Sequence, residues 1–302
     1  MPCIARVAVS VQVPPLSATT PRRAASQTDS ESISTPSRSK ITASTMADHR
    51  MLPAVQEDPI AAAELRPQVD QFRWFHRIDL GNGVVTPGED ESADKLARIH
   101  MPERLDGWSV LDIGAWDGFF SFEAERRGAE RVVAVDPECW RDPAWGPRGW
   151  GTRQPFDFAR SALRSSVHDV DIDLADLSPE SVGEFDLVLF LGLFYHLPDP
   201  WLILRRAASV CRRLMIVETH ADLQDLWRPA MAFYPGEVDG DPSNWWGPNA
   251  PLLEAMLSHE GFGRVEVFAE GRARRGARAV ARRLQRRPYR YQWGRLVAHG
   301  WR

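Results

Sequence analysis

The sequence predicts an α/β protein built on a Rossmann-like, doubly wound sheet of seven strands. From residue 109 onward, apolar segments typical of strands alternate with segments typical of helices. Residues 185–193 form a nearly continuous apolar run, as expected for a central parallel strand buried on both faces. A sharp turn at Gly114 joins the first strand of this series to its first helix. Such units make right-handed crossovers, so together they predict the doubly wound arrangement.

The elements are expected in a regular order. Before the sheet, residues 54–71 are weakly helical, Asn82-Gly83 predicts a short hairpin, and a polar helix ends near Ile99. The sheet strands are expected at 109–115, 131–136, 170–174, 185–193, 213–219, 265–269 and 291–298. The helices between them are expected at 117–128, 156–164, 201–210 and 251–260.

Composition narrows the class of protein. The 302 residues are 43% hydrophobic, enough for a buried core, and the net charge of −4 gives no general case for nucleic-acid or membrane-surface binding. The three cysteines are far apart and form no CxxC pair, which suits a reducing cytoplasm. No apolar run approaches the ~18 residues of a membrane-spanning helix. We therefore expect a cytoplasmic protein without a membrane span.

The segment V-L-D-I-G-A-W-D-G, which starts at Val110, predicts a ligand-binding turn. Gly114 lets the chain turn beside a ligand, Asp117 can cap the following helix, and Gly118 allows close backbone approach. Asp136 closes the second strand, where an acid can accept hydrogen bonds from both hydroxyls of a ribose. A nucleoside-containing cofactor is therefore expected at this turn.

The acids around the turn distinguish between two cofactor classes. A dinucleotide loop has the pattern G-x-G-x-x-G, which seats a pyrophosphate on the helix end. Here bulky Trp116 replaces the second glycine, and Asp112 and Asp117 flank the loop. Negative charge disfavours a pyrophosphate but suits a ligand with an ammonium and a sulfonium group. The pattern therefore favours S-adenosylmethionine (SAM) over NAD.

The motif from Val110 to Asp136 resembles that of the class I SAM-dependent methyltransferases. Three further segments are similar to the group related to the tRNA wobble-uridine carboxymethyltransferases, over roughly residues 71–271. They read W-F-H-R-I-D-L-G-N-G-V-V-T-P-G, F-D-L-V-L-F-L-G-L-F-Y-H-L-P-D-P and N-W-W-G-P-N.

The resemblance implies a set of cofactor contacts. Asp112 and Gly114 would contact the amino-acid part of SAM, and Asp136 would hold its ribose. Asp173 and Leu174 would bracket the adenine, with Asp176 as a competing choice for the acid. The cofactor site implied in this way comprises Asp112, Gly114, Ala115, Asp117, Gly118, Asp136, Asp173, Leu174, Leu191 and Gly192.

The acceptor side is expected at the carboxyl ends of the fourth and fifth strands. An oxygen nucleophile needs a base, and His196 is the first choice, with Tyr195 beside it and His220 on the same rim. A packing or structural role is the alternative interpretation for each of His196, His220 and the upstream His76. A long insertion follows the fifth strand and is expected to form a lid or acceptor pocket. The predicted substrate contacts are His76, Tyr234, Asn244, Trp245, Trp246 and Asn249.

The chain is accordingly divided into three parts. Residues 1–50, rich in Ser, Thr, Pro and Arg, are expected to be disordered, a transit peptide, or the product of a misplaced start. Residues 51–108 form a helical and hairpin segment on the substrate side. Residues 109–302 form the SAM-binding methyltransferase domain, with a lid-like insertion at 228–250 and a basic segment at 271–290.

Three functions are considered. The first is methyl transfer to a hydroxyl or similar group of a small molecule, with no metal. The second is modification of a tRNA wobble uridine, because Gly271 to Arg302 holds eleven arginines and no acid and is suited to tRNA phosphates. The third is a non-catalytic binding protein, against which the intact acids argue. The resembling carboxymethyltransferases have an upstream lysine for their carboxylated cofactor. This chain has none there, which favours SAM itself, although Arg77 keeps the alternative open.

Overall fold

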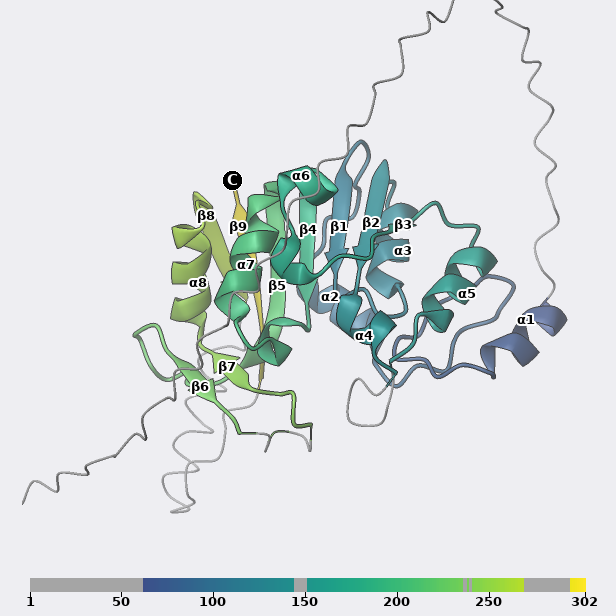
Figure 1. Ribbon diagram of the computed structural model, residues 1–302, viewed down its shortest axis with the longest axis horizontal. Coiled ribbons are helices and arrows are strands. Elements are labelled where there is room, and N and C mark those ends of the chain that lie inside the picture. Colours follow the sequence, from purple (N-terminus) through teal and green to yellow (C-terminus); the bar gives the residue numbers. More distant parts are fainter. Residues whose placement is uncertain (1–61, 144–150, 236–237, 239–240, 269–293) are drawn as a thin grey trace, which may run out of the picture. The chain divides into compact units, whose positions relative to one another are not determined.

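The computed structural model describes residues 62–143, 151–235, 238, 241–268 and 294–302. Its centre is a seven-stranded sheet with the order β3-β2-β1-β4-β5-β9-β8 (Figure 1). The first five strands in this order are parallel, whereas β9 runs antiparallel to both β5 and β8. The strands are β1 (Ser109–Ile113), β2 (Arg131–Val135), β3 (His168–Asp169), β4 (Phe185–Leu191), β5 (Cys211–Ala221), β8 (Arg264–Phe268) and β9 (Gly294–Trp301). The predicted seven-stranded α/β fold is confirmed.

Helices cover both faces of the sheet because alternate strand residues enter two separate cores. Leu111 and Ile113 join one core, with the apolar sides of α7 and α8, while Val110 joins the other, with α1, α2, α3 and α5 (Figure 1). The α-helices are α1 (Ala62–Val69), α2 (Ser92–Ile99), α3 (Phe119–Arg126), α4 (Pro137–Arg141), α5 (Gln154–Ala162), α6 (Pro179–Val182), α7 (Pro200–Ser209) and α8 (Ala250–His259).

The segment before β1 is part of the second core. Trp74 is fully buried there, and its indole N–H donates to the carbonyl of Val69 at 2.9 Å. The predicted hairpin is present as a single bridge between Asp79 and Val85. Residues 81–83 all have positive φ, which the Gly-Asn-Gly sequence permits. The N-terminal segment is thereby held against the sheet.

The third strand differs from its prediction. Residues 170–174 are not a strand; instead β3 is two residues long and pairs only with β2. At this edge the alternating Asp169, Asp171 and Asp173 form ion pairs with arginines, which takes the place of further strand pairing. Leu174 begins a short 3-10 helix, η2 (Leu174–Asp176). An edge strand with one neighbour gives a weak apolar pattern, so its position was poorly predicted.

Candidate active site

The turn after β1 is tied to the end of β2 by backbone hydrogen bonds. The N–H groups of Gly114 and Ala115 both donate to the carbonyl of Val135, at 2.8 and 3.3 Å. The N–H of Trp116 donates to Oδ2 of Asp136 at 2.8 Å. These bonds place the predicted cofactor loop and the predicted ribose acid next to each other.

Gly118 is required by the packing of this turn. Its φ is +91°, and a Cβ there would lie 2.5 Å from the ring of Phe122 and 2.7 Å from that of Phe156. Both the backbone angle and these close contacts exclude a side chain. α3 therefore starts directly after the glycine, with its first turn facing the loop.

Two buried carboxylates lie at the ends of adjacent strands. Asp112 is 2% exposed and accepts a hydrogen bond from the hydroxyl of Ser121 at 2.6 Å; burial raises its pKa to about 6. Asp136 is 6% exposed and accepts from the N–H groups of Trp116 and Cys139; burial raises its pKa to about 7. Desolvated carboxylates of this kind fit a ligand that brings an ammonium group and ribose hydroxyls.

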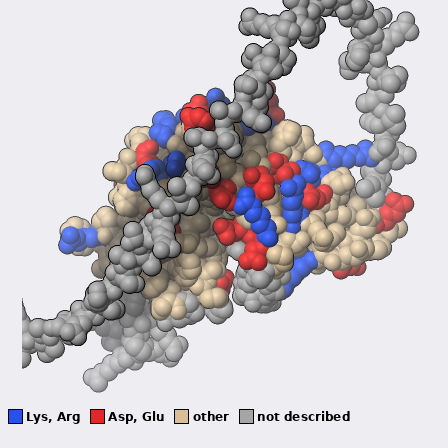
Figure 2. Space-filling view, viewed as in Figure 1, with Lys and Arg blue, Asp and Glu red and all other residues tan. Residues whose placement is uncertain are grey.

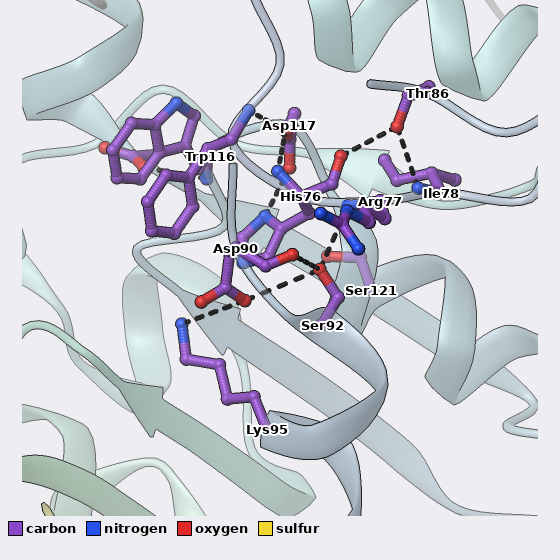
Figure 3. Close-up of polar contacts among 12 residues, drawn as sticks. His76, Arg77, Ile78, Thr86, Asp90, Ser92, Lys95, Trp116, Asp117 and Ser121 are labelled. Carbon is purple, nitrogen blue, oxygen red and sulfur yellow. Dashed lines mark hydrogen bonds and ion pairs between the residues drawn. The ribbon is translucent and has the colours of Figure 1, made fainter. Parts of the chain in front are cut away.

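Asp117 has a different environment from the one expected. It does not cap α3; its Oδ2 accepts the backbone N–H groups of Phe75 at 2.9 Å and His76 at 2.8 Å. Its Oδ1 lies 2.5 Å from Nδ1 of His76 (Figure 3). The carboxylate therefore anchors the N-terminal segment over the turn. Its predicted contact with the cofactor remains a prediction.

The two residues predicted to bracket the adenine have unlike surroundings. Leu174 is buried, whereas the Asp173 carboxylate is exposed and forms an ion pair with Arg141. An apolar side chain suits the face of an adenine ring, and the acid is already engaged by a neighbouring cation. Leu174 thus fits its predicted role better than Asp173.

The three predicted catalytic side chains lie together after β4 and β5. η3 (Phe194–His196) brings the ring of Tyr195 to 4.2 Å from His196 and 4.0 Å from His220, measured between centroids. Nδ1 of His196 lies 2.9 Å from Oγ of Ser243, whose hydroxyl already donates to Asp241, and 3.2 Å from the carbonyl oxygen of Ser243. A carbonyl only accepts, so Nδ1 carries the hydrogen and Nε2 carries the lone pair.

Burial keeps these histidines neutral. It lowers the pKa of His196 to about 4 and that of His220 to about 3. Arg295 contributes to both shifts as a secondary cause, through repulsion of an imidazolium. The pKa of Tyr195 is raised, also by burial. At neutral pH the cluster therefore contains neutral rings.

A set of charged residues that the sequence analysis overlooked surrounds Gly192. A Cβ on Gly192 would lie 3.7 Å from Oη of Tyr195, 3.9 Å from Oε2 of Glu218 and 4.0 Å from Nζ of Lys95. A guanidinium nitrogen of Arg295 donates to Tyr195 Oη at 3.2 Å and to Glu218 Oε2 at 3.4 Å. Four distant segments thus meet at the carboxyl end of β4.

One oxygen of this cluster is unpaired. Glu218 is 0% exposed, and its Oε1 has no hydrogen-bond partner among the described residues. Lys95 lies 3.9 Å from Asp90, and burial lowers its pKa. Glu218 could have been found from the sequence, because an acid among the apolar residues of strand β5 indicates a functional site. Lys95 lies in the helix that was expected to be polar, and Arg295 is one of the eleven arginines from Gly271 to Arg302.

The insertion after β5 contacts the predicted catalytic residues. It contains a two-stranded sheet, β6 (Met231–Phe233) with β7 (Trp246–Pro248), which was not predicted because both strands are short. The N–H of Trp245 donates to the carbonyl of Tyr195 at 2.9 Å, and the indole of Trp246 donates to that of Leu197 at 2.8 Å. These bonds bring the insertion to the acceptor side of the site.

The polar residues of the insertion divide into two groups. Tyr234 donates its hydroxyl to Asp222 at 2.6 Å, and Asn249 caps α8. The amide of Asn249 also donates to the carbonyl of Arg228 at 2.8 Å, so both side chains support the fold. In contrast, Asn244 is 5% exposed, and its Oδ1 has no hydrogen-bond partner among the described residues. Asn244 therefore keeps an atom available for the predicted substrate contact.

Two kinds of feature are absent from the part of the chain that the structure describes. No group of three or more His, Cys, Asp or Glu side chains is arranged to hold a metal ion. No described helix is long and apolar enough to cross a membrane.

Comparison with known proteins places this site in a family. Residues 88–262 match the family described as methyltransferase domain, which is more than half of the chain. The tRNA U34 carboxymethyltransferase of Alteromonas mediterranea is 28% identical over 166 residues, 54% of this chain and 47% of that protein. The enzyme of the same name from Pseudomonas fluorescens is 27% identical over 187 residues, 61% of this chain and 54% of that protein. The chain thus spans about half the length of these relatives.

A solved structure has the same fold. The N-terminal domain of EvdMO1 with S-adenosylhomocysteine (SAH) bound superposes with a TM-score of 0.53 at 19% identity. The match covers 79% of this chain and 96% of that domain. The fold, the buried acids at the ends of β1 and β2, and the family match agree: the chain has the class I methyltransferase fold and belongs to the methyltransferase domain family, and part of it is similar to the tRNA U34 carboxymethyltransferases.

Proposed function

We propose that this enzyme transfers the methyl group of SAM to a hydroxyl of a small molecule. The observation that carries the proposal is the buried polar cluster at Gly192, where the unpaired Oε1 of Glu218 can accept a hydrogen bond from a hydroxyl. Lys95 and Tyr195 offer donors for a second oxygen of the same molecule. The cluster therefore suits a polyhydroxylated acceptor such as a sugar.

SAM supplies an electrophilic methyl carbon on a sulfonium. In the proposed arrangement Asp112 and Asp136 hold its ammonium and ribose, which aligns the donor with the end of β4. The acceptor oxygen attacks the methyl carbon, the carbon–sulfur bond breaks, and its electron pair stays on sulfur. The hydroxyl proton passes to Glu218 Oε1, with His196 Nε2 as the competing base. The insertion at Asn244 and Trp245 closes the acceptor side and excludes water.

The test is transfer from methyl-tritiated SAM to added sugars. D-fucose is the first acceptor to try, because the EvdMO1 domain was crystallised with SAH and D-fucose. Glu218→Gln should keep the affinity for SAM and slow transfer about 100-fold, as expected for loss of a general base. The matched control is Glu266→Gln on β8, whose side chain is 42% exposed. A protein that binds SAM but labels neither D-fucose nor other sugars and polyols would contradict the small-molecule proposal.

A second candidate is carboxymethyl or methyl transfer to a tRNA wobble uridine. It is favoured by the names of the curated relatives and by Arg295, whose partly buried guanidinium supplies the positive charge that a carboxylated cofactor needs. Arg77 does not supply it, because that guanidinium binds the carbonyl of Gly88 and Glu91. The mass of the cofactor that co-purifies tests the carboxymethyl form of this candidate, since carboxylated SAM is heavier than SAM; transfer of label to tRNA tests the methyl form.

A further inference from the structure

The cofactor's methionine end carries an ammonium and a carboxylate, and the turn after β1 is equipped mainly for the ammonium. Four backbone N–H groups of the turn already donate within the protein. Those of Gly114 and Ala115 bind Val135, that of Trp116 binds Asp136, and that of Gly118 binds the carbonyl of Ala115. Because these N–H groups are already engaged and the buried Asp112 is an acceptor, this part of the turn offers a ligand acceptors rather than donors. The carboxylate therefore needs a donor from another segment.

His76 is a buried polar side chain of the segment that covers the turn. It is 4% exposed, and its Nε2 has no hydrogen-bond partner among the described residues. Its ring stacks on Phe119, the first residue of α3, with centroids 5.5 Å apart and planes inclined by 17°. Nε2 is thus an unused polar atom at the start of α3, beside the turn.

Asp117 and an aromatic stack hold this imidazole in place. Oδ1 of Asp117 lies 2.5 Å from Nδ1 of His76, and Oδ2 accepts two backbone N–H groups of the same segment (Figure 3). Beside it, Phe75 stacks on Trp116 of the turn, with centroids 4.0 Å apart and planes inclined by 4°. A carboxylate oxygen only accepts, so Nδ1 is the donor toward Asp117, and Nε2 is the ring nitrogen that has no partner among the described residues.

We propose that His76 binds the α-carboxylate of the methionine part of SAM through Nε2–H, with Asp117 as its positioning residue. The inference rests on the proposed use of SAM and adds a binding residue from outside the glycine turn. Asp112 then takes the ammonium on one side of the methionine and His76 the carboxylate on the other. It also gives the buried Asp117 a purpose, because its carboxylate fixes both the backbone of this segment and the orientation of the imidazole.

Decarboxylated SAM makes the test specific, because it differs from SAM only by the carboxylate. By calorimetry, the unsubstituted protein should bind SAM more tightly than decarboxylated SAM. His76→Gln should weaken SAM binding about tenfold or more, as for a lost charged hydrogen bond, and leave the affinity for decarboxylated SAM unchanged. Asp117→Asn should lower SAM affinity in the same selective way but by less. His299→Gln, a buried histidine bonded to the carbonyl of Ile99, is the matched control.

Each other outcome overturns the assignment. Equal loss of both ligands in His76→Gln would mean a structural role, and no loss would mean that His76 does not touch the cofactor. If Lys95→Met selectively weakens SAM binding and His76→Gln does not, the carboxylate of SAM is bound by Lys95 instead. Retained binding of decarboxylated SAM shows that each variant is folded. If the unsubstituted protein binds neither ligand, the proposed cofactor fails; if it binds both equally, only the assignment of His76 fails.

Discussion

At the residue scale, the site depends on carboxylates that the fold removes from water. Asp112 and Asp136 lie at the ends of adjacent strands and are almost fully buried, so their charged forms are costly without a ligand. A bound ammonium or ribose hydroxyl would offset part of this desolvation cost. Each side chain keeps hydrogen bonds that orient it before any ligand arrives. The acids are therefore preorganised, and their burial links ligand binding to pH.

Asp136→Asn should reveal this cost in the free protein. Because burial raises the pKa of Asp136 from 3.8 to about 7, the folded protein holds this proton where the unfolded chain has lost it. The group's contribution to the free energy of unfolding therefore falls as pH rises from about 4 to about 7. The variant should gain stability relative to the unsubstituted protein across that window, by roughly 3 kcal/mol, and urea titrations at several pH values measure it.

The control for this measurement is Asp94→Asn, at an exposed position of α2. Its stability relative to the unsubstituted protein should not follow the same curve. A constant difference between Asp136→Asn and the unsubstituted protein at all pH values would show that Asp136 is not a desolvated acid.

At the element scale, the insertion after β5 depends on one amide. Asn249 accepts the N–H of Leu252 at the start of α8 and the N–H of Ala230 at the start of the insertion. Its amide nitrogen donates to the carbonyl of Arg228. One side chain thus starts a helix and closes a loop of about twenty residues, so the position of the insertion at the acceptor side depends on it.

Asn249→Ala should destabilise the protein more than the loss of an ordinary cap. A lost N-cap costs about 1 kcal/mol, and the additional buried N–H and carbonyl groups left unpaired should bring the total to about 2–3 kcal/mol. Asp199→Ala, which removes the cap of α7 at the N–H of Leu202, is the matched comparison and should cost only about 1 kcal/mol. Equal losses in thermal unfolding would show that the loop contacts of Asn249 contribute nothing.

At the scale of the whole molecule, the sheet brings distant segments to one rim. Lys95, Tyr195, Glu218 and Arg295 come from α2, η3, β5 and β9 and converge at Gly192 because β9 lies antiparallel beside β5. The curated relatives are matched over about half their length, so the acceptor is a property to test rather than to transfer from them.

Substitution of the arginines at 272–290 distinguishes between the two candidate acceptors. They lie outside the described residues, so this prediction rests on charge alone. If tRNA is the substrate, changing six of them to glutamine should reduce retention of tRNA on the protein at low salt and flatten its salt dependence. Methyl transfer to D-fucose should be unaffected. A full-length protein that never retains tRNA would exclude the wobble-uridine candidate.

The order of strands and helices, the glycine turn and the acids Asp112 and Asp136 could be predicted from the sequence, because local periodicity and short-range motifs carry that information. The short β3, β6 and β7 could not, since two or three residues give no usable period. Tertiary structure alone decided that Asp117 faces His76, that Asn249 supports a loop, and that Lys95, Glu218 and Arg295 share one site. The pairings of Asp117 with His76 and of Arg295 with Tyr195 and Glu218 join residues 41 to 100 positions apart, and only the packed sheet brings them within bonding distance.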